Sequence, residues 1–192
     1  LPFEDRKALL EAPFLPFDGM NETGLVIAMA AVPPGDMERD PDKDTIGSIR
    51  VMREILDLAA TVEEAVMILE KYNIDFGGGP PLHYLIADST GGAALVEFYR
   101  GEMVVIPNQH PWHQATNFLA ASFQGIPVHT CWRYDRMTEN LTASSGTLSA
   151  EEAVLLLEDV SANGTQWSVV YGISSGEIKV VMGRDFQRVH TF

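Results

Sequence analysis

Short turns join the strand-like segments of this chain directly to one another, and this arrangement limits the folds that it can adopt. Residues 82–88, 93–99 and 103–106 are largely apolar and aromatic, and only short glycine-containing turns separate them. A second hairpin is expected from residues 167–173 and 178–182, followed by a final strand within residues 186–192. Strands connected in this way pair antiparallel. The pattern therefore disfavours a doubly wound parallel sheet, in which strands alternate singly with helices.

The helices are expected in two pairs. Within residues 45–60, apolar side chains recur at three- and four-residue spacing from Ile46 to Leu56, which predicts an amphipathic helix. Thr61 and Ser149 are each followed three residues later by a glutamate, so a helix begins after each in a capping box. A further helix is expected over residues 131–141. The order of elements predicts an α/β (α+β) fold with antiparallel sheets and separate helix layers, in one domain over residues 1–192.

Three other segments carry structural expectations. The continuous apolar run over residues 24–32 predicts a strand buried on both faces. The opening, residues 1–17, contains three prolines among apolar residues and is expected to be extended and docked on the domain. Residues 36–44 form a charged loop.

Composition excludes several classes of function. The chain has 13 basic and 27 acidic residues, a net charge of −14, so it lacks the basic surface of a nucleic-acid or membrane-surface binder. The longest apolar stretch is too short to cross a bilayer, and no signal peptide is visible, which favours a cytoplasmic location. The single cysteine, Cys131, excludes an internal disulfide and a zinc site built on several thiolates.

The histidines and the cysteine are candidate chemical groups. His110 and His113 lie three residues apart, but Pro111 opposes a helix there, so aromatic loop packing is expected and no metal. His83, in an apolar strand, is expected to be a hydrogen-bonded core residue. Cys131 is expected to be small, buried and inert, although His129 is close enough in sequence to activate it.

The segment from Asp18 to Leu25 reads, from its residues alone, as a tight polar turn that leads into a buried strand. Its sequence, Asp-Gly-Met-Asn-Glu-Thr-Gly-Leu, also resembles the Asp-Gly-Met-Asn-Glu-Lys-Gly-Leu turn of the choloylglycine hydrolase family. That family comprises linear-amide hydrolases related to penicillin V acylases, bile salt hydrolases and isopenicillin N acyltransferases. Further segments resemble it in the same order: Pro81-Leu-His-Tyr84, Thr116-Asn117-Phe118, Arg133-Tyr134 and Trp167-Ser-Val-Val-Tyr171.

The resemblance implies a fold and a mechanism. The implied fold is the stacked α-β-β-α arrangement of N-terminal nucleophile hydrolases, with two antiparallel sheets between helix layers. The implied reaction is hydrolysis or acyl transfer at a linear amide carbon–nitrogen bond of a small-molecule substrate. An N-terminal cysteine attacks the carbonyl while its own α-amino group handles protons, and an oxyanion hole stabilises the intermediate. No cofactor is implied.

The same resemblance assigns three site residues. Asn117 would donate its side-chain amide to the oxyanion hole, and the backbone N–H of Ala31 would be the second donor. Bile salt hydrolases have asparagine at the position of Ala31, so only the backbone group is retained here. Arg133 matches an active-site arginine that orders the surroundings of the nucleophile. The alternative readings are a structural loop residue for Asn117 and a surface cation of a helix for Arg133.

The family's opening segment, which carries the cysteine, has no match in this sequence, which begins at Leu1. We therefore expect the chain to correspond to the C-terminal part of such a domain, incomplete without an N-terminal segment or a second chain. Unfilled sheet edges then favour pairing with that chain or homo-oligomerisation. Two alternatives stay open, namely a non-catalytic binding module on the same scaffold and a cysteine hydrolase built on Cys131 and His129.

Overall fold

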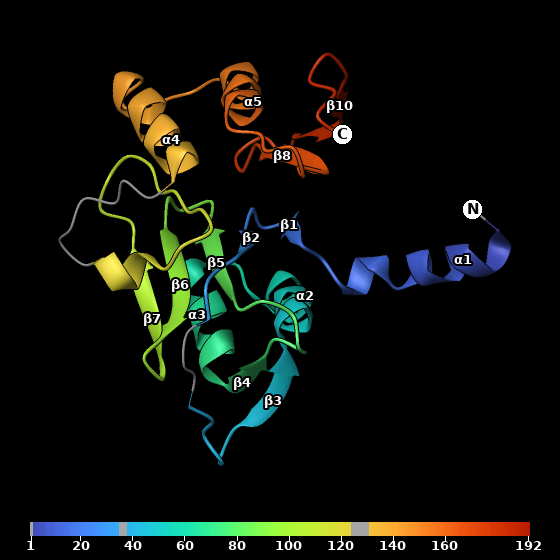
Figure 1. Cartoon of the computed structure of the whole chain (residues 1–192), viewed down its shortest axis with the longest axis vertical. Coiled ribbons are helices and arrows are strands. Elements are labelled where there is room, and N and C mark those ends of the chain that lie inside the picture. Colours follow the sequence, from blue (N-terminus) through green and yellow to red (C-terminus); the bar gives the residue numbers. More distant parts are fainter. Residues whose placement is uncertain (1, 35–37, 124–130) are drawn as a thin grey trace.

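The computed structural model describes residues 2–34, 38–123 and 131–192. Its largest element is a five-stranded sheet with the strand order β1-β2-β5-β6-β7, in which every neighbouring pair is antiparallel (Figure 1). The strands are β1 (Asp18–Met20), β2 (Val26–Ala31), β5 (Leu82–Ala87), β6 (Ala93–Tyr99) and β7 (Glu102–Pro107). The predicted meander of three strands is therefore confirmed as β5, β6 and β7. Between β6 and β7, Arg100 and Gly101 both have positive φ (54° and 84°), as in the tight turns whose twist suits a hairpin.

One face of this sheet packs against α2 (Ser48–Leu58) and α3 (Val62–Glu70). The predicted cap of α3 is present, because the Thr61 side chain accepts a hydrogen bond from the backbone N–H of Glu64. Burial of the apolar stripes of both helices against the sheet forms the hydrophobic core. Core residues include Ile27, Tyr84, Ile86, Val96 and Phe98 from the strands and Val51, Met52, Ile55, Ala65 and Leu69 from the helices.

A short parallel pair of strands corrects the prediction for residues 45–60. β3 (Asp44–Gly47) pairs with β4 (Tyr72–Asp75), and α2 begins only at Ser48. The backbone is extended at Gly47, which is the N-cap of α2, and the β-branched Thr45 and Ile46 suit a strand. Since α2 and α3 together connect β3 to β4, the crossover that a parallel pair requires is provided.

Two predictions about burial near the N-terminus are wrong. β2 lies within the predicted range, but Ile27 is its one fully buried residue, so the strand is not buried on both faces. Residues 2–17 are not extended, because they form the helical turns α1 (Phe3–Lys7), η1 (Ala8–Leu10) and η2 (Ala12–Phe14), and most of their described side chains are exposed. These turns project from the sheet (Figure 1), and the side chains of Phe3 and Leu10 are both 74% exposed. Pro13 does not prevent helical turns because it occupies the first turn of η2.

The remaining elements form a second group beside the end of the large sheet (Figure 1). They are α4 (Trp132–Ala143), α5 (Ala150–Asp159) and the antiparallel sheet of β8 (Trp167–Tyr171), β9 (Ile178–Met182) and β10 (Val189–Thr191). α5 begins with the predicted capping box at Ser149. The predicted mixed α/β class with antiparallel sheets is confirmed. None of the helices in the described ranges has the length and apolar character needed to span a membrane.

The carboxylate of Asp18 connects the five-stranded sheet to the three-stranded sheet. It accepts hydrogen bonds from the indole N–H of Trp167, at 2.8 Å, and from the phenol of Tyr171. Asp18 belongs to β1 and both donors belong to β8. Burial, together with the bond to Asp18, raises the pKa of Tyr171 well above its usual range, so this phenol remains a donor at any physiological pH.

Candidate active site

Three segments distant in sequence meet at the end of β2. The side-chain Nδ2 of Asn117 donates to the backbone carbonyl of Ala31 at 2.7 Å, a contact between residues 86 positions apart. The guanidinium of Arg133, in the first turn of α4, donates to Oδ1 of Asn117. The structure thus brings together the three residues that the family resemblance singled out.

The backbone groups of Ala31 face Asn117 and not a neighbouring strand. Along a strand, the N–H and C=O of successive residues point to opposite sides. Val32 donates to the carbonyl of Pro81 on the β5 side, so the groups of Ala31 point away from β5. On that other side, β1 pairs with β2 no farther than Ala28. Among the described strands, none pairs with the N–H of Ala31, which lies on the same side of β2 as the carbonyl that holds Asn117.

Two contacts determine which way the amide of Asn117 points. A guanidinium only donates and a carbonyl only accepts, so Oδ1 must face Arg133 while Nδ2 faces Ala31. One Nδ2–H then has no hydrogen bond to any residue of the described ranges, and the side chain is exposed. A charged donor on the amide oxygen also strengthens the remaining N–H as a donor.

The loop that carries Asn117 is held on both sides. Thr116 is 4% exposed, and the ring of Phe118 packs edge-on against Tyr134 of α4, with ring centroids 5.2 Å apart. Beyond it, the carboxylate of Glu97 accepts the backbone N–H groups at the start of η3 (Ala120–Phe123). The sequence analysis did not single out Glu97, although a lone carboxylate inside the apolar strand 93–99 is a usable signal.

Cys131 lies at the N-cap of α4, two residues before Arg133. It is half-buried, so the expectation of a buried cysteine is wrong. Burial alone would raise the pKa of the thiol. The Thr116 side chain, the backbone N–H groups of Tyr134 and Arg133, and the Arg133 charge outweigh it and hold that pKa below its usual value. His129, the partner of Cys131 in the cysteine-hydrolase alternative, lies outside the described residues.

Three other histidines make contacts within the fold. His83 is 1% exposed and hydrogen-bonded to Glu97, which confirms the expectation of a core residue. His110 stacks on Trp112, and a ring nitrogen of His113 lies 3.2 Å from the carbonyl of Ile106. Within residues 2–34, 38–123 and 131–192, no three histidine, cysteine, aspartate or glutamate side chains gather in a group that could hold a metal ion.

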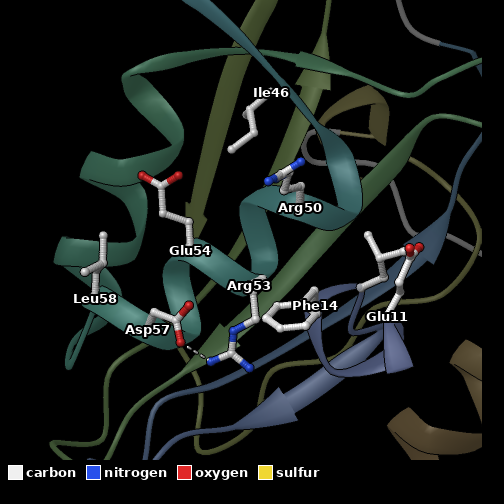
Figure 2. Close-up of a pocket in the computed structure, with 9 residues that line it drawn as sticks. Glu11, Phe14, Ile46, Arg50, Arg53, Glu54, Asp57 and Leu58 are labelled. Carbon is white, nitrogen blue, oxygen red and sulfur yellow. Dashed lines mark hydrogen bonds and ion pairs between the residues drawn. The ribbon is translucent and has the colours of Figure 1, made fainter. Parts of the chain in front are cut away.

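A cavity of about 730 Å³ lies elsewhere, between the N-terminal turns and α2 (Figure 2). Glu11 and Phe14 form one wall of it, and Arg50, Arg53 and Asp57 of α2 form the opposite wall. Arg53 and Asp57 pair with each other, as the dashed line in Figure 2 shows. None of the residues that line this cavity belongs to the Ala31–Asn117–Arg133 site, which is defined by its polar contacts and not by cavity volume.

Comparison with known proteins identifies the family of this chain. The model for linear amide C–N hydrolases of the choloylglycine hydrolase family matches residues 8–145, well over half of the chain. The chain belongs to the choloylglycine hydrolase family. Ala31, Asn117 and Arg133 lie within the residues that match the family model, whereas strands β8–β10 lie beyond them.

Solved structures of similar fold include a mutant conjugated bile acid hydrolase from Clostridium perfringens. It has a TM-score of 0.72 at 16% identity, over 92% of this chain and 71% of the hydrolase. Penicillin V acylase from Agrobacterium tumefaciens has a TM-score of 0.68 at 20% identity, over 88% of this chain and 63% of the acylase. The choloylglycine hydrolase family member described here therefore shares their fold.

Proposed function

We propose that this protein cleaves a linear amide bond of a small-molecule substrate, with the backbone N–H of Ala31 and the side-chain N–H of Asn117 as its oxyanion hole. The observation that carries the proposal is the contact of Asn117 with both Ala31 and Arg133. In the proposed arrangement, the free N–H of Asn117 and the backbone N–H of Ala31 lie beside one another at the end of β2. Two fixed donors aimed at one point are what an anionic tetrahedral intermediate requires.

The nucleophile in this proposal is an N-terminal cysteine supplied by a segment outside these 192 residues. Its sulfur bonds to the carbonyl carbon, its α-amino group takes the thiol proton, and the carbonyl electron pair moves to oxygen. The two N–H groups stabilise the resulting oxyanion. When the C=O bond re-forms, the C–N bond breaks and the amine leaves with the proton. Water then hydrolyses the thioester, or an acceptor amine takes the acyl group.

Arg133 acts on this step through Asn117. Its guanidinium holds the amide oxygen, so the amide cannot rotate to place oxygen against the developing negative charge. Only the side chain of Asn117 separates the positive charge of Arg133 from the proposed oxyanion, so this charge also lowers the energy of the oxyanion. Arg133 is thus a positioning residue in the proposed mechanism.

Substitution of Asn117 by alanine tests the proposal directly. In the intact enzyme with its N-terminal cysteine, Asn117→Ala is expected to lower kcat by about 10²–10³, as removal of other single oxyanion donors does. Penicillin V and a conjugated bile acid are suitable first substrates, since the structural neighbours are named for them. Asn108→Ala is the matched control, because the side chain of Asn108 bonds, among the described residues, only to the backbone of His110 in the adjacent loop. Activity of a folded Asn117→Ala enzyme within tenfold of wild type would contradict the assignment.

The lowered pKa of Cys131 favours a second candidate, in which this thiol is the nucleophile. The two candidates separate in one experiment. If the N-terminal cysteine is the nucleophile, Cys131→Ala retains amidase activity. Iodoacetamide then also inhibits the Cys131→Ala enzyme, in which Cys131 cannot be labelled. If Cys131 is the nucleophile, Cys131→Ala abolishes activity while the fold persists. A folded protein that binds amides but turns none over supports the binding-module alternative.

A further inference from the structure

The large sheet buries a hydrogen-bonded histidine–glutamate pair on the face opposite its hydrophobic core. His83 of β5 and Glu97 of β6 are 1% and 0% exposed, and Nδ1 of His83 lies 3.0 Å from Oε1 of Glu97. Their strand neighbours Tyr84 and Val96 point to the other face, into the core with α2 and α3. A fully buried carboxylate is unfavourable unless all of its hydrogen bonds are made.

Glu97 makes those bonds to the loop that carries Asn117. Its Oε1 accepts the backbone N–H of Ala120 at 2.9 Å, and its Oε2 accepts that of Ala121 at 2.8 Å. These are the first N–H groups of η3, which have no partner within the helix itself. Together with Nδ1 of His83, three hydrogen-bonding groups converge on this one side chain.

The pair also borders the strand that carries Ala31. In the β2–β5 register, His83 is the partner of Ala30 and Leu82 is the partner of Ala31. Only two residues separate Asn117 from Ala120, and Leu119 between them is buried. The pair therefore connects the end of β2, which carries Ala31, to the loop that carries Asn117.

We propose that Glu97, held by His83, is a positioning residue that sets the place of Asn117 relative to the backbone N–H of Ala31. This inference rests on the proposed function of Asn117. Glu97 does not touch substrate and acts only by fixing the start of η3. A displacement of about 1 Å at a catalytic donor is enough to lower a rate by about 10²-fold.

Glu97→Gln is the first test in the intact enzyme. Glutamine keeps the size of the side chain but offers one acceptor oxygen in place of two, so at least one of the three bonds is lost. We expect kcat to fall by about 10- to 100-fold with little change in KM. His83→Asn, which keeps a donor near the position of Nδ1, is expected to retain most of the wild-type kcat, whereas His83→Leu loses it. Glu102→Gln, at an exposed position on the neighbouring strand β7, is the matched control.

A double-substitution cycle distinguishes positioning from a general structural role. If Glu97 acts through Asn117, Glu97→Gln lowers kcat in the wild type but adds almost nothing in the Asn117→Ala background. Additive losses, or a wild-type kcat in folded Glu97→Gln, overturn the inference and leave the proposed function standing. If Glu97→Gln does not fold, Ala120→Pro decides, because it removes one N–H at a position that tolerates proline. An unchanged kcat in Ala120→Pro overturns the inference.

A measurement without activity separates failure of the inference from failure of the proposed function. The side-chain amide resonances of Asn117 are expected to shift in Glu97→Gln and to stay in place in Glu102→Gln. If Asn117→Ala is fully active, the proposed function fails, and this shift alone then reports whether Glu97 positions the loop. Unchanged resonances in Glu97→Gln contradict the positioning role.

Discussion

The two regions of the molecule differ in how they are held together. The five-stranded sheet with α2 and α3 surrounds a continuous cluster of buried apolar side chains. Among the described residues from Cys131 onward, by contrast, Val154 and Val181 are the buried ones. Because buried apolar area supplies most of the folding free energy, the first region is the stable scaffold and the second depends on specific contacts with it.

The candidate site lies where these regions meet. Ala31 and the loop of Asn117 belong to the scaffold, whereas Arg133 comes from the region with few buried side chains. One proposed donor of the oxyanion hole is thus a backbone group of the scaffold, and the other is a side chain on a loop attached to it. The arginine that orients one of them is on a helix without a fully buried side chain. Loosening the second region should therefore affect orientation of the amide before it affects the sheet.

The largest expected effect compares one leucine from each region. Leu69 of α3 is 1% exposed in the core and Leu155 of α5 is 61% exposed. Leu69→Ala removes packed side-chain atoms and leaves a cavity, so we expect a loss of about 2–5 kcal/mol in the free energy of unfolding measured with urea. Leu155→Ala is expected to stay within about 0.5 kcal/mol. Equal losses in the two variants would mean that α5 is packed as firmly as α3.

A smaller and more local effect is expected at the connection between the sheets. Asp18→Ala removes the acceptor of both Trp167 and Tyr171, and bonds to a charged group contribute about 1.5–3 kcal/mol. Backbone hydrogen exchange should accelerate in β8–β10 and remain slow in β5 and β6. Tyr171→Phe should produce part of the same change, and adding it to Asp18→Ala should produce little more. Faster exchange throughout the large sheet would contradict the separation of the two regions.

The two helix caps give the next comparison. Thr61 caps α3 in the scaffold, and Ser149 caps α5 in the other region. Alanine at either position removes a side-chain acceptor, which costs about 1 kcal/mol. For Thr61→Ala the loss is expected in the global unfolding transition. For Ser149→Ala it is expected only as faster exchange at the start of α5, and a global loss there would show that the regions unfold together.

Local patterns were sufficient to predict most of the elements. The hairpin turns, the capping residues and the amphipathic spacing each act over a few residues, and the strands and helices that they predict are present. The β3–β4 pair was missed because Thr45 and Ile46 continue the apolar spacing of α2, while their strand partners lie beyond α3. The exposed N-terminal turns were missed because apolar composition was read as burial.

The candidate site depended on long-range contacts, which local patterns do not contain. Ala31, Asn117 and Arg133 were singled out by family resemblance, and nothing in their spacing predicts that they touch. Glu97 was overlooked because its loop partners follow more than twenty residues later. The burial of Cys131 was overestimated because an N-cap position leaves a side chain at the helix end, partly open to solvent.

The smallest expected effect concerns the charge that Arg133 brings to this boundary. Only the thiolate reacts with iodoacetamide, so the alkylation rate of Cys131 rises with pH and levels off above the thiol pKa. Since that pKa is lowered, the midpoint of the profile should lie at lower pH than for a free cysteine derivative. Arg133→Gln removes a positive charge that favours the thiolate, which moves the midpoint back to higher pH. Arg136→Gln, on the same helix but paired with Asp159 and Glu139, should leave it in place. If the pH midpoint of alkylation is unchanged in Arg133→Gln, this guanidinium does not act on the thiol, and α4 is held away from the loop of Asn117 in solution.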